Sequence, residues 1–233
     1  MATEDAVAAD FAPVAALLAD RARAAMLTAL LDGRPLAAGE LARAAGVGAS
    51  TASAHLARLL DGGLVTVVAQ GRHRYYELRD AEVAQLVEGL SRMSPPVKVR
   101  GLRQSREARR LHRARTCYDH LAGQAGVALF AALLDGGLLE PDADGYAATP
   151  KGAERFAGLG VDVAALRGSR RRFAWRCLDW TERRPHLNGA LAAALTDRMI
   201  DLGWFERGAA PRALAVTDAG LAGLADAFGC VLP

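Results

Sequence analysis

Two short segments in the second half of the chain carry side chains that could do chemistry, and they carry them in a similar order. The first segment reads Cys117-Tyr118-Asp119-His120, and the second reads Cys177-Leu178-Asp179-Trp180 and continues to His186. Thiolates and imidazoles are ligands for zinc and other soft metals, and thiols are also targets of oxidants. The candidate effector-sensing or redox residues are therefore Cys117, Asp119, His120, Cys177, Asp179, Trp180 and His186.

A metal site would require the two segments to meet. In a helix, Cys117 and His120 would lie three residues apart on one face. The four candidate ligands are then Cys117, His120, Cys177 and His186. Asp119 and Asp179 would be hydrogen-bond partners of these ligands and would not contact the metal. However, the chain has no C-x-x-C motif, and about sixty residues separate the two segments. The sequence therefore favours packing of the cysteines as small buried hydrophobes over effector or redox sensing, and both over metal binding. No cofactor is predicted, and a bound metal ion is kept as an alternative.

The residues between Gly39 and Tyr76 form a second pattern of functional interest, one that could bind nucleic acid. They predict a helix, a turn at Gly46, a second helix with a small and polar start, and a two-stranded hairpin with a basic tip. Such a helix suits the major groove of duplex DNA, and an arginine-tipped hairpin suits phosphate or the minor groove. The candidate DNA-binding residues are Ser50, Thr51, Ser53, His55, Arg58, Arg72, His73 and Arg74.

Residues 21–78 resemble the winged helix-turn-helix of the ArsR family of bacterial transcription regulators. The resemblance lies in the segments A-D-R-A-R, E-L-A-R-A-A-G-V, S-T-A-S-A-H-L-A-R-L, G-G-L-V and G-R-H-R-Y-Y-E-L. A weaker resemblance to larger members covers most of residues 115–205, through R-T-C-Y-D-H-L-A-G and C-L-D-W-T-E-R-R-P-H-L-N-G-A-L. The resemblance implies a cytoplasmic bacterial homodimer that binds double-stranded DNA and represses transcription until an effector releases it.

The chain departs from the family pattern at several positions. Residues 40–45 read E-L-A-R-A-A and lack the cysteines of the arsenic-sensing members. Ala49 and Ala54 stand where the family often has Gln and a first His, so that base reading would rest on the neighbouring hydroxyls, on His55 and on Arg58. His55 has a second interpretation as a partly buried packing residue. The effector, the operator, the regulated genes and the sign of regulation are not predicted.

The remaining sequence predicts a mainly α fold with small β-hairpins (α+β). Pro95-Pro96 separates a winged helix-turn-helix domain (10–94) from a dimerisation and effector-sensing domain (97–233). Residues 97–123 are predicted to be a basic helix that either links the domains or contacts DNA phosphates. The motif L-L-D-G-G-L-V recurs as L-L-D-G-G-L-L at 133–139 and loosely at 199–205, which predicts two further winged-helix-like units.

Composition excludes several classes of protein. The acidic, alanine-rich start lacks the order of a signal peptide, no segment is long and apolar enough for a membrane span, and three cysteines do not form a disulfide scaffold. No nucleophile triad, phosphate loop or paired-carboxylate motif suggests an enzyme. The alternative function is a winged-helix protein-interaction module without gene-regulatory DNA binding, because the fold alone does not decide function.

Overall fold

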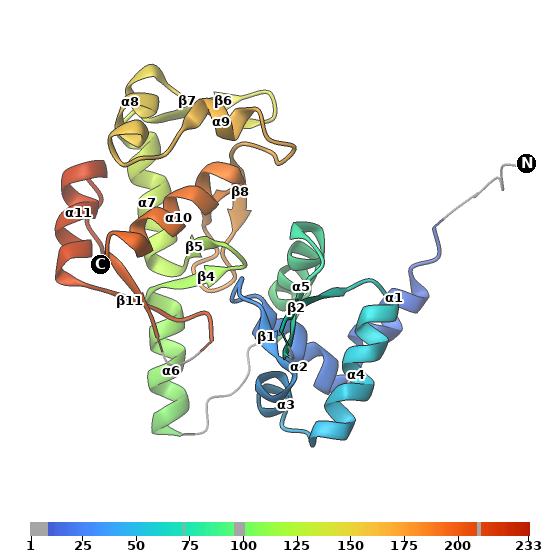
Figure 1. Ribbon diagram of the computed structural model, residues 1–233. Helices are drawn as coiled ribbons and strands as arrows, with labels where there is room; N and C mark the ends of the chain where they lie inside the picture. Colours follow the sequence, from blue (N-terminus) through green and yellow to red (C-terminus); the bar gives the residue numbers. More distant parts are fainter. Residues whose placement is uncertain (1–8, 72, 96–100, 209–210) are drawn as a thin grey trace, which may run out of the picture. The chain divides into compact units, whose positions relative to one another are not determined.

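The computed structural model describes residues 9–71, 73–95, 101–208 and 211–233, and these form two units that divide between Val87 and Glu88 (Figure 1). The division lies inside one helix, upstream of the Pro95-Pro96 boundary expected from the sequence. The first unit contains α1 (Ala12–Leu18), α2 (Arg21–Leu30), β1 (Leu36–Ala37), α3 (Ala38–Ala45), α4 (Ala49–Asp61), β2 (Val65–Gln70), β3 (His73–Leu78) and the start of α5 (Ala81–Met93).

The first unit is built on the packing of α2, α3 and α4. Leu27 of α2, Leu41 of α3 and Leu56 of α4 are fully buried, as expected for the apolar stripes of three amphipathic helices. α3 ends at Gly46, whose φ of 66° lies in the left-handed region that favours glycine. This turn directs the chain into α4. The predicted helix-turn-helix is therefore present.

A three-stranded antiparallel sheet in the order β1-β3-β2 completes the unit. β2 and β3 pair from Val65 with Leu78 to Gln70 with His73, so Gly71 lies at the tip of the hairpin. Burial falls along β2, from a buried Val65 at the base to exposed residues toward the tip. The hairpin therefore projects from the core as a wing.

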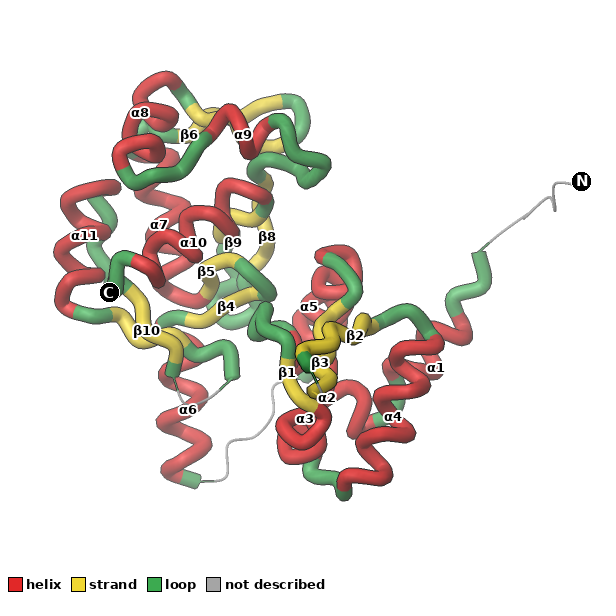
Figure 2. The backbone as a smooth tube through the Cα atoms, in the orientation of Figure 1, coloured by secondary structure: helices red, strands yellow, loops and turns green. Residues whose placement is uncertain are grey.

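The second unit alternates helices with short hairpins (Figure 2). Its elements are α6 (Leu102–Arg113), β4 (Arg115–Cys117), β5 (His120–Ala122), α7 (Gly123–Asp135), β6 (Leu139–Asp142), β7 (Gly145–Ala148), α8 (Pro150–Gly158), α9 (Val163–Arg167), β8 (Trp175–Leu178), β9 (Pro185–Asn188), α10 (Ala190–Asp201), β10 (Phe205–Arg207), β11 (Leu214–Val216) and α11 (Asp218–Phe228). Leu133 of α7, Leu191 of α10 and Phe156 of α8 are fully buried at the centre of its core.

The same order of elements occurs twice in this unit. Hairpin β4–β5 leads to α7, hairpin β6–β7 and α8, and hairpin β8–β9 leads to α10, hairpin β10–β11 and α11. Equivalent threonines cap the last helix of each copy: Thr149 accepts a hydrogen bond from the amide of Gly152, and Thr217 accepts one from the amide of Gly220. The two helix-hairpin-helix units predicted from the repeated L-L-D-G-G motif are therefore present, and each is preceded by an additional hairpin.

The prediction of one helix over residues 97–123 is wrong for its second half. Residues 96–100 lie outside the described part of the chain, and α6 ends at Arg113. Arg115 to Ala122 instead form the β4–β5 hairpin. The cause is distant in sequence, because the Thr116 amide donates to the carbonyl of Arg212 at 2.8 Å, and the amide of Leu214 donates to the carbonyl of Ala114 at 3.0 Å. These strand contacts replace the hydrogen bonds of a longer helix.

Candidate functional site

The exposed face of α4 carries most of the predicted DNA-binding residues. Ser50, Thr51, Ser53 and Arg58 are all exposed, and the opposite face of the helix is buried. Gly48 occupies the N-cap without a side-chain cap, and Ser50 and Thr51 lie in the first helical turn. Between Ser50 and Arg58 the exposed face is therefore small and polar and carries no acidic side chain, which suits a helix in a DNA groove.

His55 lies on a different side of α4. Its side chain is only 16% exposed, with Nδ1 3.7 Å from Oδ1 of Asp20 and 3.5 Å from Nη1 of Arg23. Arg23 is itself buried, and it donates from Nε to the Leu17 carbonyl at 2.7 Å. These contacts favour the packing interpretation of His55, in which the imidazole joins α4 to α2.

The wing presents two of its three predicted basic residues. His73 and Arg74 are exposed at the start of β3, beside Gly71, whose φ of 60° allows the tight turn. Arg72 lies outside the described residues. At the other end of the hairpin, Arg79 pairs with Asp80, with Nε 2.7 Å from Oδ2.

The candidate metal ligands come together in the second unit as two cross-strand pairs. Cys117 lies opposite His120 in the β4–β5 hairpin, and Cys177 lies opposite His186 in the β8–β9 hairpin. The helical spacing that suggested the first pair is thus wrong, but a tight hairpin also brings its two residues together. Tyr118 permits this turn at a φ of 64°, an uncommon conformation for a residue with a side chain.

One potential ligand atom from each of these four residues lies within 4.8 Å of the others. All four side chains are buried, and the three cysteines of the chain are free thiols. The two imidazoles stack with ring centroids 5.1 Å apart, and their Nε2 atoms are 3.2 Å apart. The residues Cys117, His120, Cys177 and His186 are called the Cys/His cluster below. The cluster has the donor set of a zinc site.

Each histidine of the cluster turns its other nitrogen to a carboxylate. His120 Nδ1 lies 3.3 Å from Asp119 Oδ1, and His186 Nδ1 lies 3.5 Å from Asp179 Oδ2. The second distance is long for a hydrogen bond, and within the described residues Nδ1 of buried His186 has no hydrogen-bond partner. Both rings therefore point Nε2 inward and Nδ1 toward an acid, as metal-binding histidines do.

An arginine neutralises each of the two acids. Arg171 makes a two-pronged ion pair with Asp119, and Arg115 donates from Nη2 to both oxygens of Asp179 at 2.9 Å. The second pair is fully buried, and the guanidinium of Arg115 also stacks over Trp180, 4.7 Å from the ring centroid. The sequence pattern concealed this role, because Arg115 belongs to a basic run that was expected either to link the domains or to contact DNA phosphates.

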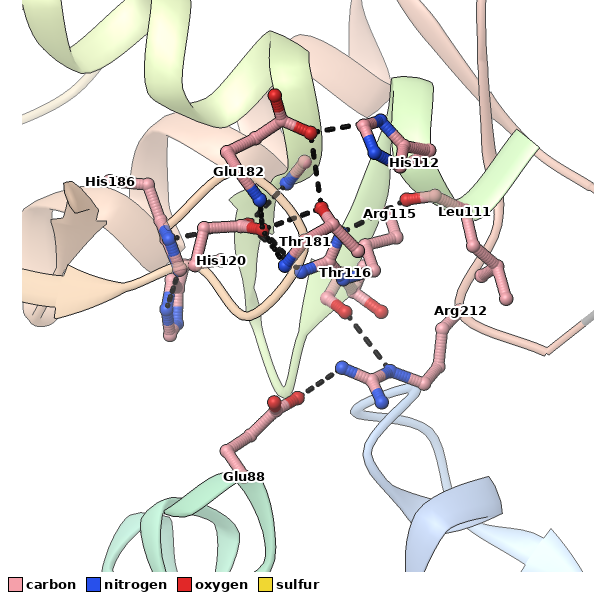
Figure 3. A network of polar contacts seen from close by, with 12 residues as sticks. Glu88, Leu111, His112, Arg115, Thr116, His120, Thr181, Glu182, His186 and Arg212 are labelled. Atoms are coloured by element: carbon pink, nitrogen blue, oxygen red, sulfur yellow. Dashed lines mark hydrogen bonds and ion pairs between the residues drawn. The ribbon is translucent and has the colours of Figure 1, made fainter. Parts of the chain in front are cut away.

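Asp179 is the centre of a wider network of polar contacts, whose members Arg115, Thr181 and Glu182 are labelled in Figure 3. It accepts hydrogen bonds from the amide of Gly123 at 2.7 Å, from the hydroxyl of Thr181 at 2.7 Å and from the amide of Glu182 at 3.1 Å. Glu182 in turn contacts His112 of α6, with Oε1 2.9 Å from Nδ1. The network therefore connects the Cys/His cluster to the last turn of the basic helix.

The pKa values of the cluster reflect its burial and its charges. A hydrogen bond to Cys177, together with burial, raises the pKa of the Cys117 thiol to about 12. Burial opposes protonation of His120, but Cys117 and Asp119 outweigh it and raise the imidazole pKa to about 9. Burial would also raise the pKa of Asp179, but Arg115 and the other donors hold it well below its usual value. Any metal that binds must therefore displace protons.

Known proteins match both the first unit by itself and most of the whole chain. A family model described as a helix-turn-helix domain matches residues 18–68. The HTH-type transcriptional regulator YdfF of Bacillus subtilis (strain 168) is 43% identical over 211 residues, which cover 91% of this chain and 93% of YdfF. This chain belongs to the HTH-type transcriptional regulators.

Solved structures also resemble part of this regulator. HlyU from Vibrio cholerae N16961 is 32% identical, covers 35% of this chain and 87% of its own, and has a TM-score of 0.33. A fragment of Mb0332 from Mycobacterium bovis, described as the homodimeric winged helix-turn-helix DNA-binding domain of a possible ArsR-family regulator, is 34% identical. That match covers 34% of this chain and 73% of the other, with a TM-score of 0.33. Among the described residues, the regulator has no helix that is long and apolar enough to cross a bilayer.

Proposed function

We propose that this transcriptional regulator is a homodimeric repressor that reads its operator through α4, and that an effector sensed by residues 88–233 releases it. The observation that carries the proposal is the exposed polar face of α4, where Thr51, Ser53 and Arg58 lie opposite a buried apolar face. Hydroxyls and guanidinium groups can donate to base edges in the major groove. The Ser53 hydroxyl also donates within the helix, to the Ala49 carbonyl at 3.0 Å, which fixes its position.

The wing would supply contacts that are independent of sequence. His73 and Arg74 are exposed near its tip, and a cation there gains affinity by releasing counterions from DNA phosphates. A two-fold dimer would place its recognition helices in successive major grooves, roughly 34 Å apart. The operator would then be a palindrome with half-sites one helical turn apart.

The proposal is tested by fluorescence anisotropy with the DNA upstream of the regulator's own gene and a scrambled duplex of equal length. Arg74→Ala should weaken binding to both duplexes and reduce the salt slope by about one. Arg79→Ala is the matched control, because it removes the same charge at the far end of the hairpin, where Arg79 is paired with Asp80. Thr51→Ala should instead reduce the preference for the operator.

Three results would contradict parts of this proposal. Equal affinity of the wild-type protein for the operator and the scrambled duplex would refute sequence-specific reading. An unchanged salt slope in Arg74→Ala would refute the role of the wing. A monomer in sedimentation equilibrium, both free and bound to DNA, would refute the dimer.

A further inference from the structure

We propose that the Cys/His cluster binds one divalent metal ion of the zinc class, in a tetrahedral centre with two thiolate and two imidazole ligands that cross-links the two hairpin–helix repeats. Each repeat supplies one cysteine and one histidine, which face each other across a hairpin. Zinc is the divalent ion that this donor set and a four-coordinate geometry select. The proposal concerns the second unit alone and holds whether or not the protein represses transcription.

The spacing of the two nitrogens agrees with such a centre. Two imidazole nitrogens bound at about 2.0–2.1 Å in a tetrahedral site lie about 3.3 Å apart. The Nε2 atoms of His120 and His186 are 3.2 Å apart. The four ligand atoms also lie within 4.8 Å of one another, which leaves room for the longer edges that the two sulfurs would form.

The orientation of the rings suits two nitrogens that share one metal ion. Nδ1 of each ring faces a carboxylate, Asp119 or Asp179, so Nε2 of each ring is the nitrogen that faces the cluster. In the metal-free protein the two Nε2 atoms, 3.2 Å apart, share a hydrogen bond. A metal ion that binds both rings would displace the proton of that bond.

The charges of the surroundings select a divalent ion. Two thiolates, two neutral imidazoles and a divalent cation sum to zero, whereas a monovalent or trivalent ion would leave a buried net charge. The carboxylates behind the rings add no net charge, because Arg171 pairs with Asp119 and Arg115 with Asp179. Outer carboxylates of this kind orient metal-binding histidines and raise the basicity of the ligand.

The first experiment uses the full-length protein, reduced and freed of metal by a chelator, and titrates it with Co²⁺ and then Zn²⁺. We expect one ion per chain, the intense visible bands of tetrahedral cobalt with thiolate charge transfer in the near ultraviolet, and loss of these bands when zinc replaces cobalt. Mg²⁺ should not compete, because it prefers oxygen ligands in octahedral geometry.

Single substitutions show which residues bind the metal ion. Cys117→Ser and Cys177→Ser should each abolish the thiolate-to-cobalt band. Cys230→Ser is the matched control, because Cys230 is also a buried free thiol of the second unit but lies outside the cluster. Asp119→Asn should weaken zinc about 10–100-fold in competition with a chromophoric chelator, as outer-shell changes do, while keeping one ion per chain. Circular dichroism shows whether each variant is folded.

A readout on the wild-type protein keeps the test decisive if the serine variants unfold. Zinc should protect Cys117 and Cys177 from alkylation in mild denaturant more strongly than it protects Cys230, when the reaction is mapped by mass spectrometry. The proposal is overturned if no stoichiometric Co²⁺ or Zn²⁺ binds the reduced chain. It is also overturned if the same cobalt spectrum persists in both folded serine variants, or if zinc protects none of the three thiols.

Discussion

Asp179→Asn should be among the most destabilising single-atom changes available in the second unit. In every hydrogen bond described for Asp179, its carboxylate is the acceptor. The two oxygens accept from Arg115, Gly123 and Thr181. An asparagine in either orientation presents its NH₂ group to one set of these donors. The substitution also leaves the guanidinium of Arg115, whose side chain is 1% exposed, without its counter-charge.

Breaking one half of a buried ion pair typically costs about 3–5 kcal/mol, because the remaining charge stays buried and unpaired. Asp119→Asn provides the comparison. Arg171, the partner of Asp119, is 33% exposed, so its guanidinium can be solvated by water after the change. Exposed or half-exposed pairs contribute about 0–1 kcal/mol. The two variants make the same chemical change, and the difference in unfolding free energy should be at least about 2 kcal/mol.

Urea denaturation monitored by tryptophan fluorescence measures this difference. Trp175, Trp180 and Trp204 are the only tryptophans of the chain, so fluorescence reports on residues 88–233 alone. A chelator in every sample keeps metal binding out of the comparison. Equal midpoints and slopes for Asp179→Asn and Asp119→Asn would refute the reasoning, because they would mean that the guanidinium of Arg115 finds solvent or another partner.

The same assay tests two further features of the second unit. Gly126→Ala should cost about 1–3 kcal/mol, because a Cβ there would lie 2.4 Å from the Leu121 carbonyl oxygen, whereas Gly158→Ala meets nothing within 4 Å and should be neutral or slightly stabilising. An unchanged midpoint for Gly126→Ala would mean that α7 can move away from β5 at no cost. Thr149→Ala and Thr217→Ala should each cost about 1 kcal/mol, because both hydroxyls cap the last helix of a repeat. A much smaller cost at one of the two would show that the two copies do not share this capping energy.

The sequence predicted the first unit well because its signals are local. Gly46 and Gly71 mark turns that need a left-handed residue, and the apolar spacing of α4 separates its buried face from its exposed face. His55 was harder to place, because its interpretation depends on Asp20 and Arg23, more than thirty residues away. No local pattern distinguishes an imidazole that faces DNA from one that faces a neighbouring helix.

The four residues of the Cys/His cluster were grouped by residue type, and the structure brings them together, but the helical spacing proposed for the first pair was wrong. The basic run before Cys117 continues a helical pattern, and a helix was therefore expected through residue 123. Contacts to Arg212 and Leu214 override that local preference and produce a hairpin. The exposure of Arg115 was misjudged for the same reason, because its partner Asp179 lies 64 residues away.

The internal repeat explains why four ligands lie together, because each copy contributes a hairpin that carries one cysteine and one histidine. In each copy a cysteine lies in the first strand, at its last residue in β4 and one residue before the end in β8, and a histidine lies opposite it on the second strand. A glycine with positive φ then follows the second strand, Gly123 in one copy and Gly189 in the other. Neither hairpin alone supplies more than two ligands, which is too few for a closed zinc site. The cluster exists only where β5 and β9 pack together. Metal occupancy would therefore report on the packing of the two repeats, because separating them removes half of the ligands from the ion.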